Sequence, residues 1–227
     1  EEKGWWREVL TVNDTNIIPK DQLDQELKEL KLEYGDVEGT AKFEQEYMCS
    51  FEAPVIGSYY GEFINRAEAE NRITSVPYDN SVPVNTAWDL GVGDSTAIWF
   101  YQLVGQEIHL IDYYASSGVG LEHYINELRS KGYSYNKHFA PHDIKAKELG
   151  TGKTRLEMAR NFGINFEIVP KVSRDDGIQA VRSILPRCWF DKEKCDLGIS
   201  ALKNYCREWD EKNKVYRPYP KHDWASH

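Results

Sequence analysis

Three aspartates stand where a predicted strand or the chain itself ends, and their carboxylates could hold metal ions. Asp89 closes the segment TAWD at 86–89, Asp143 follows FAPH at 139–142, and Asp223 lies within KHDWASH at 221–227. A carboxylate in a mostly apolar strand is costly unless it is paired or bound to a metal. Mg²⁺ often takes only one or two carboxylates together with water and phosphate. The three residues therefore predict a site for metal-assisted phosphoryl chemistry.

Each aspartate also has a purely structural interpretation. Asp89 would sit at an edge position and face water, Asp143 would be a helix N-cap, and Asp223 would belong to a frayed acidic end. The positions of Asp89 and Asp143 favour the metal site, because ligand sites of open α/β sheets gather at the carboxyl ends of strands. Two ions ~3.5–4 Å apart can activate water and stabilise the leaving oxygen of a phosphodiester.

A second motif imitates a phosphate-binding loop. The segment GTGKT at 150–154 matches the end of the P-loop pattern, but position 147, where that pattern needs Gly, is Lys147. We interpret the segment as a loop that leads into a helix. Its cations Lys145, Lys147 and Lys153 either contact DNA phosphates or are solvated.

Two histidines have the spacing of a helical metal pair. His138 and His142 lie four residues apart, but their segment is predicted to be a strand and contains Pro141. We therefore interpret both as structural, with His142 next to Asp143 and close to the site.

The composition is that of a globular chain with 41% hydrophobic and 29% charged residues and a net charge of −9. The negative charge argues against a surface covered with DNA-binding cations. Bound metal ions would, however, reverse the charge around an acidic metal site. The four cysteines have no Cys-x-x-Cys spacing, which favours reduced thiols over a zinc ribbon or a disulfide framework. No apolar run reaches the ~20 residues of a membrane span, and no signal peptide is apparent. The chain starts at Glu1 rather than Met, and we expect a fragment or a processed product.

The elements that position the aspartates begin at residue 84. Strands are predicted over 84–90, 95–104 and 107–115, with a hairpin turn at 91–94. Helices and strands then alternate as helix 121–131, strand 137–141, helix 154–162, strand 165–169, and helices 175–185 and 197–209. This order predicts an α/β fold with a mixed sheet flanked by helices, as in the RNase H-like fold. Other α/β folds share so coarse an order.

The first 83 residues have a different pattern. We predict a short strand at 9–12, and a helix after Pro19 with apolar residues at spacings of three and four. The segment 41–51 carries aromatic side chains that favour core packing over a docking surface. A connector from 54 to 83 is predicted to hold a helix over 62–71 and a strand over 73–78.

Four segments resemble motifs of the large terminase subunits of tailed bacteriophages and prophages. TAWDLG at 86–91 with DSTAI at 94–98 resembles their first acidic motif, FAPHD at 139–143 their second, and KHDWASH at 221–227 the start of their last. FEQEYMCSF at 43–51 is similar to the segment that joins their ATPase and nuclease domains. The four stand in the family's order and span nearly the whole chain.

The resemblance implies a nuclease that cuts concatemeric double-stranded viral DNA during genome packaging, with an RNase H-like fold and two Mg²⁺ or Mn²⁺ ions. It implies that Asp89 and Asp143 are metal ligands. The third carboxylate is either Asp223 or an aspartate beyond His227, and His227 would then lie beside the metals.

The resemblance also divides the chain and names its partners. Residues 1–52 are expected to be the tail of the ATPase domain with the linker, and 53–227 the nuclease domain. No phosphate-binding loop is present, so no ATPase activity is expected. The implied partners are DNA, the small terminase subunit and the portal protein, with no membrane, in the cytoplasm of the bacterial host.

Two other functions remain open. Another RNase H-like nuclease, such as a transposase or resolvase, would share the acidic cluster but not the segment 43–51. A non-enzymatic module that binds protein or carbohydrate is conceivable for a chain with seven tryptophans and fourteen tyrosines. Such a module predicts no metal affinity and no effect of Asp89→Ala.

Overall fold

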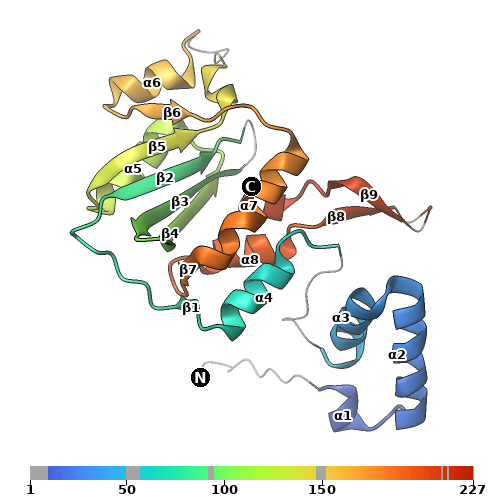
Figure 1. The fold of residues 1–227 in the computed structure, drawn as a ribbon. Coiled ribbons are helices and arrows are strands. Elements are labelled where there is room, and N and C mark those ends of the chain that lie inside the picture. The colour runs from blue at the N-terminus through green and yellow to red at the C-terminus, as the bar shows by residue number, and fades with distance from the viewer. Residues whose placement is uncertain are drawn as a thin grey trace, which may run out of the picture.

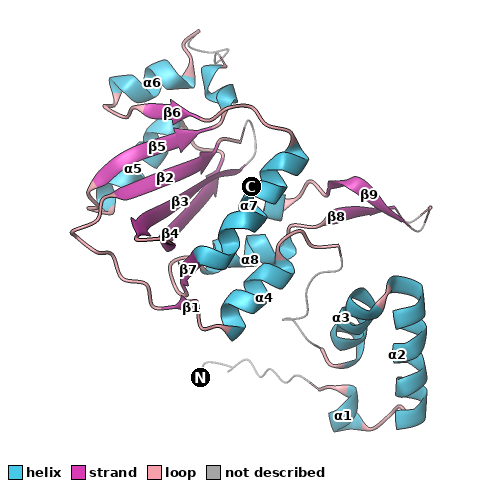
Figure 2. Cartoon of the chain, in the orientation of Figure 1, coloured by secondary structure: helices cyan, strands magenta, loops and turns pink. Residues whose placement is uncertain are grey.

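The computed structural model of the protein describes residues 10–49, 57–91, 95–146, 152–210, 212–213 and 215–226. A seven-stranded mixed sheet with helices on both faces forms its centre (Figures 1 and 2). The strand order is β1-β7-β4-β3-β2-β5-β6. Within it, the order β4-β3-β2-β5-β6 is the RNase H-like arrangement, so the predicted fold class is confirmed.

Three consecutive antiparallel strands form the middle of the sheet. They are β2 (Val84–Asp89), β3 (Ser95–Val104) and β4 (Glu107–Ser117). Asp89 is paired with Ala97, and Ala97 with Ala115. The alternation of apolar side chains predicted these strands to within two residues at their ends. Residues 92–94 of the predicted hairpin turn lie outside the described residues.

Parallel strands extend the sheet on both sides. On one side β5 (Tyr135–Ala140) pairs with β2, and β6 (Phe166–Ile168) pairs with β5. On the other side β7 (Cys188–Asp191) pairs with β4, and β1 (Ile73–Thr74) pairs with β7. The strand predicted over 73–78 is thus only two residues long, and β7 was not predicted.

Alternate residues of the central strands pack into two cores, one on each face of the sheet. Ile98 and Phe100 join a core with α5 (Leu121–Ser130) and α6 (Arg155–Asn161). Ala97 and Trp99 face the other core, with α4 (Gly61–Ala69), α7 (Arg174–Ile184) and α8 (Asp196–Asn204). The predicted helices over 121–131, 154–162 and 175–185 are confirmed.

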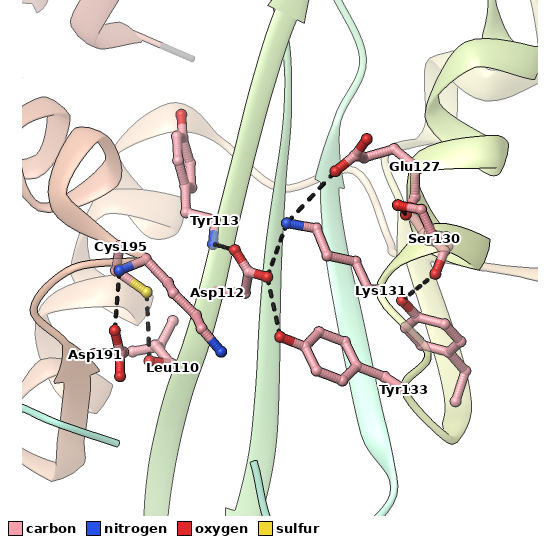
Figure 3. A network of polar contacts seen from close by, with 12 residues as sticks. Leu110, Asp112, Tyr113, Glu127, Ser130, Lys131, Tyr133, Asp191 and Cys195 are labelled. Carbon is pink, nitrogen blue, oxygen red and sulfur yellow. Dashed lines mark hydrogen bonds and ion pairs between the residues drawn. The ribbon is translucent and has the colours of Figure 1, made fainter. Parts of the chain in front are cut away.

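A buried ion pair ties the end of α5 to β4 (Figure 3). The carboxylate of Asp112 is 4% exposed and lies 2.9 Å from Lys131 Nζ. It also accepts hydrogen bonds from the Tyr133 hydroxyl at 3.0 Å and from the Tyr113 backbone N–H at 2.8 Å. These donors satisfy a charge that would otherwise be costly to bury.

The N-terminal helices α1 (Val12–Thr15), α2 (Lys20–Tyr34) and α3 (Asp36–Tyr47) share a small core of their own. Gly39 of α3 crosses α2 closely, because a Cβ at that position would lie 2.5 Å from the Leu30 carbonyl oxygen. The strand predicted at 9–12 is wrong. Thr11 and Asp14 form a capping box that starts α1 at Val12.

The C-terminal part differs most from expectation. The helix predicted over 197–209 ends at Asn204, and the chain turns into β8 (Arg207–Asp210), which pairs with β9 (Val215–Pro220) in a two-stranded ribbon. A 3-10 turn, Trp224–Ser226, follows and packs on α8. Among the described residues, every helix is too short or too polar to cross a bilayer.

Candidate active site

Asp89 is the last residue of β2, and its side chain is exposed. Residues that face each other in an antiparallel pair share a side of the sheet. The pairing of Asp89 with Ala97 therefore places the carboxylate on the face covered by α7 and α8. Asp89 forms contacts in the structure, and its position at the strand end keeps it open to solvent.

Asp143 lies just beyond the neighbouring parallel strand. The register pairs Ala87 of β2 with Phe139 of β5. Continued by two residues, this register sets Asp89 opposite Pro141, about 4.8 Å away across the ladder. Asp143 follows two residues later, in the 3-10 turn His142–Lys145, with its side chain exposed. The sheet thus brings Asp89 and Asp143 to the same edge.

The interpretation of Asp143 as a helix N-cap is wrong. Pro141 precedes the turn, and Asp143 lies inside it, where its backbone carbonyl accepts a hydrogen bond from Ala146 N–H at 2.8 Å. The carboxylate is left to project into solvent.

Two tyrosines that no sequence motif singled out are affected electrostatically by Asp89. Burial and the Asp89 carboxylate raise the pKa of Tyr113 to about 12. Burial and Tyr59 raise the pKa of Tyr205, Arg174 lowers it, and Asp89 adds a smaller upward effect. Both hydroxyls therefore stay protonated near neutral pH. Their positions depend on the pairing of β3 with β4 and on the packing of α8.

The C-terminal turn reaches the surroundings of Tyr205. Ala225 and Ser226 line a small cavity of about 230 Å³ together with Tyr60, Trp99 and Tyr205. Asp223 itself caps this turn, since its Oδ1 accepts from Ala225 N–H at 3.0 Å and its Oδ2 lies 3.2 Å from Lys221 Nζ. His227 lies outside the described residues.

The donor set at this edge fits a hard cation. Asp89 and Asp143 are exposed carboxylates, and Mg²⁺ commonly binds one or two such groups while keeping several waters. Across the residues that the structure describes, no three His, Cys, Asp or Glu side chains gather into a metal-holding group. Asp89 comes from the end of β2, and Asp143 from the 3-10 turn that follows β5.

The two histidines behave differently. His138 is 6% exposed, and its Nδ1 lies 2.7 Å from Thr86 Oγ1 in β2. Burial lowers its pKa, so the ring is neutral at physiological pH. This matches the structural role predicted for it. His142 is exposed and directly precedes Asp143.

Two of the three lysines proposed to contact DNA lie in the described part of the chain. Lys145 is exposed at the end of the 3-10 turn that holds Asp143, and Lys153 is exposed next to Thr154. Lys147 lies outside the described residues. Thr154 and Glu157 form a capping box that starts α6 at Arg155, so residues 152–154 lead into a helix as predicted.

Comparison with solved structures identifies the same architecture in phage proteins, whereas no protein-family model and no curated protein sequence matches the chain. The large terminase of a thermophilic bacteriophage, in complex with ADP, gives a TM-score of 0.55 at 15% identity, over 96% of this chain and 51% of that chain. Another structure of that terminase gives 0.53 at 16% identity, over 93% and 50%. The nuclease domain of the P22 large terminase is less similar, at 0.47 and 18% identity over 66% and 81%.

The chain thus spans about half the length of the thermophilic phage's terminase. At this level of identity the similarity concerns architecture. The chain has the fold of about half of a phage large terminase, built around an RNase H-like sheet.

Proposed function

We propose that this chain is the nuclease part of a terminase large subunit, a metal-dependent endonuclease that cuts concatemeric double-stranded viral DNA during genome packaging. The observation that carries the proposal is the position of Asp89 and Asp143 after two neighbouring parallel strands of an RNase H-like sheet. The motifs around both residues and the fold shared with the large terminase of the thermophilic phage support it.

In this proposal Asp89 and Asp143 hold two divalent ions, Mg²⁺ or Mn²⁺. When bound, such ions make water a stronger nucleophile and neutralise charge on the leaving oxygen. Asp223, or an aspartate further along the full protein, adds the third carboxylate, and His227 lies beside it. Tyr113 and Tyr205 stay neutral, so they add no negative charge that would repel a phosphate.

The lysines on the neighbouring loop complete the proposed site. Lys145, Lys147 and Lys153 contact the DNA backbone beside Asp143. Contacts to phosphates position a duplex but carry no sequence information, so cleavage in vitro is expected to show little sequence preference.

The proposal extends to the division of the chain. Residues 1–52 are the tail of the ATPase domain and the linker, which agrees with the separate small core of α1 to α3. Residues 53–227 are the nuclease domain. The partners are the small terminase subunit, the portal protein and DNA, in the cytoplasm of the bacterial host.

The test is nicking of supercoiled plasmid in Mn²⁺, Mg²⁺ or EDTA. Wild type is expected to cut only with metal. Asp89→Asn and Asp143→Asn are each expected to lower the nicking rate more than about 100-fold. Loss of a group that only supports a metal ligand typically costs about 10–100-fold. Asp24→Asn, an equal charge change on the exposed side of α2, is the matched control. Equal cutting by wild type and both site variants would refute the assignment.

A second readout does not depend on turnover. Titration of Mn²⁺ followed by electron paramagnetic resonance should show binding by wild type and by Asp24→Asn. Binding should be weaker in Asp89→Asn and in Asp143→Asn. If wild type neither binds Mn²⁺ nor cuts, the non-enzymatic module becomes the better account.

A further inference from the structure

A cavity of about 450 Å³ lies between helix α7 and the ribbon of β8 and β9. Three arginines line it, Arg182 from α7, Arg207 from β8 and Arg217 from β9, together with Tyr59 and Asp175. In Figure 1 the ribbon projects from the molecule beside the end of α7. Although the net charge of the chain is −9, three arginine side chains gather at this cavity.

Tyr59 holds two of these arginines. The guanidinium groups of Arg182 and Arg207 each lie 5.9 Å from the centre of its ring. Arg182 Nε also donates a hydrogen bond to the Tyr59 carbonyl at 3.0 Å. These contacts orient the arginine pair in advance of any ligand, which lowers the entropy lost on binding.

The charges of the three arginines are not equivalent. Arg217 lies 3.3 Å from Glu208 and 3.4 Å from Asp210, so its charge is largely compensated within the ribbon. Arg182 and Arg207 form no ion pair with any carboxylate in the described part of the chain. Asp175 also lines the cavity. Among the charged residues that line the cavity itself there are three arginines and one aspartate, whereas Glu208 and Asp210 contact Arg217 from outside the lining.

Tyrosines that pack against each other connect the cavity to the core on the face of the sheet that carries Asp89. The ring centres of Tyr59 and Tyr205 are 5.1 Å apart. Tyr59 and Tyr205 also pack in the core that contains Ala97, the residue paired with Asp89 in the sheet. Helix α7, which carries Arg182, and the carboxylate of Asp89 thus lie on the same face of the sheet.

We propose that Arg182 and Arg207 form a phosphate clamp that holds the DNA backbone next to the cleavage site. The proposal rests on the proposed nuclease function and adds to it a place where the substrate is held. Planar guanidinium groups suit phosphate oxygens, since each can donate two parallel hydrogen bonds. Backbone contacts of this kind position a duplex without reading its sequence.

The experiment measures binding of a fluorescent duplex oligonucleotide by anisotropy in EDTA, at several salt concentrations. Arg207→Ala should weaken binding by about fivefold and lower the slope of log affinity against log salt by about 1, as for one lost phosphate contact. Arg207→Glu should weaken binding further. Arg187→Ala, the same charge change on an exposed arginine near the Gln106 turn, should bind like wild type.

Arg182 needs a separate design, because its bond to the Tyr59 carbonyl also supports the fold. Arg182→Lys keeps the charge but loses the forked geometry, and should weaken binding less than Arg207→Glu. Circular dichroism of each variant checks folding. A competition arm with inorganic phosphate at matched ionic strength separates a DNA-backbone site from a site for free phosphate.

Unchanged affinity and salt slope in folded Arg207→Ala and Arg207→Glu would overturn the clamp. Binding of inorganic phosphate that depends on Arg207, without any effect on DNA, would overturn it as well. Failure of the clamp and failure of the nuclease are distinguishable. If cutting depends on Asp89 but the Arg207 variants bind DNA like wild type, only the clamp is refuted. If DNA binding depends on Arg207 but no metal supports cutting, only the nuclease function is refuted.

Discussion

Thr86 and His138 meet across strands β2 and β5, with Thr86 Oγ1 2.7 Å from His138 Nδ1. The indole N–H of Trp88 donates to the same hydroxyl oxygen at 2.8 Å. The hydroxyl hydrogen is then available to the ring nitrogen, which fits a neutral imidazole that accepts at Nδ1. This buried contact joins the two strands that lead to Asp89 and Asp143.

The first prediction concerns pH. Burial lowers the pKa of His138 below the value near 6.5 of an unfolded chain. Between the two values the unfolded state binds more protons, so the contribution of His138 to stability is complete above about pH 6.5 and falls as the pH drops toward its folded pKa. Between about pH 7.5 and 5.5 the Tm of wild type should fall further than the Tm of His138→Gln. His142→Gln, at an exposed position, should behave like wild type, and equal losses in all three proteins would contradict the prediction.

The second prediction concerns the ion pair of Asp112 and Lys131. Lys131→Met leaves a buried carboxylate without its cation and should cost about 3 kcal/mol of unfolding free energy, the low end for a broken buried pair. The double variant with Asp112→Asn should recover part of that loss. Glu127→Gln removes only a 3.5 Å contact of Lys131 near the surface and should cost less than about 0.5 kcal/mol. Chemical denaturation of the four proteins measures these differences, and equal effects of Lys131→Met and Glu127→Gln would refute the prediction.

The third prediction compares two glycines within helices. A Cβ on Gly198 of α8 would lie 2.5 Å from Trp99 and 2.8 Å from Tyr113. Overpacking of this kind typically costs about 1–3 kcal/mol, so Gly198→Ala should lower the Tm. Gly177 of α7 has its nearest neighbour at 3.9 Å, and Gly177→Ala should stabilise by about 0.5–1 kcal/mol through helix propensity. Opposite signs in thermal unfolding are expected, and a stabilised Gly198→Ala would show that α8 does not pack on Trp99 as described.

The fourth prediction concerns the cysteines, which are unpaired in the structure. Burial raises the pKa of Cys188 to about 12. Burial raises that of Cys195 as well, with further contributions from Asp112 and Asp191. Because the thiolate is the reactive form, both thiols should resist an aromatic disulfide reagent at about pH 8 until the protein unfolds.

The half-buried Cys206 serves as the comparison for those two thiols. Cys206→Ser should remove signal from the fraction that reacts in the native state and leave the slow fraction unchanged. Rapid native labelling of Cys188 or Cys195, identified by mass spectrometry of peptides, would show that the core around β7 opens readily.

Local pattern was sufficient for much of the fold. The central strand was recognisable as the continuous apolar run from Ala97 to Phe100. A strand between two cores needs apolar groups on both of its faces. The start of α6 was also readable, since Thr154 and Glu157 have capping-box spacing. Asp89 and Asp143 could be selected because each follows a segment with strand character.

Elements that depend on distant partners were missed. The four residues of β7 become a strand because they fit between β1 and β4. The helix predicted over 197–209 ends early because Arg207 N–H bonds the Gly57 carbonyl and the next residues pair with β9. Propensity over a short window contains no information about such partners.

The sequence by itself determined which residue types are present and which segments form the central strands, since these follow from apolar periodicity and capping. Tertiary structure decided which of the aspartates share an edge and what surrounds them. Asp89 and Asp143 come to the same edge of the sheet because β5 pairs with β2 in parallel across about fifty residues of chain. The positions of Tyr113 and Tyr205 and the arginine cavity depend on tertiary structure, because α7 and α8 pack on the face of the sheet that carries Asp89 and the ribbon meets α7 at the cavity.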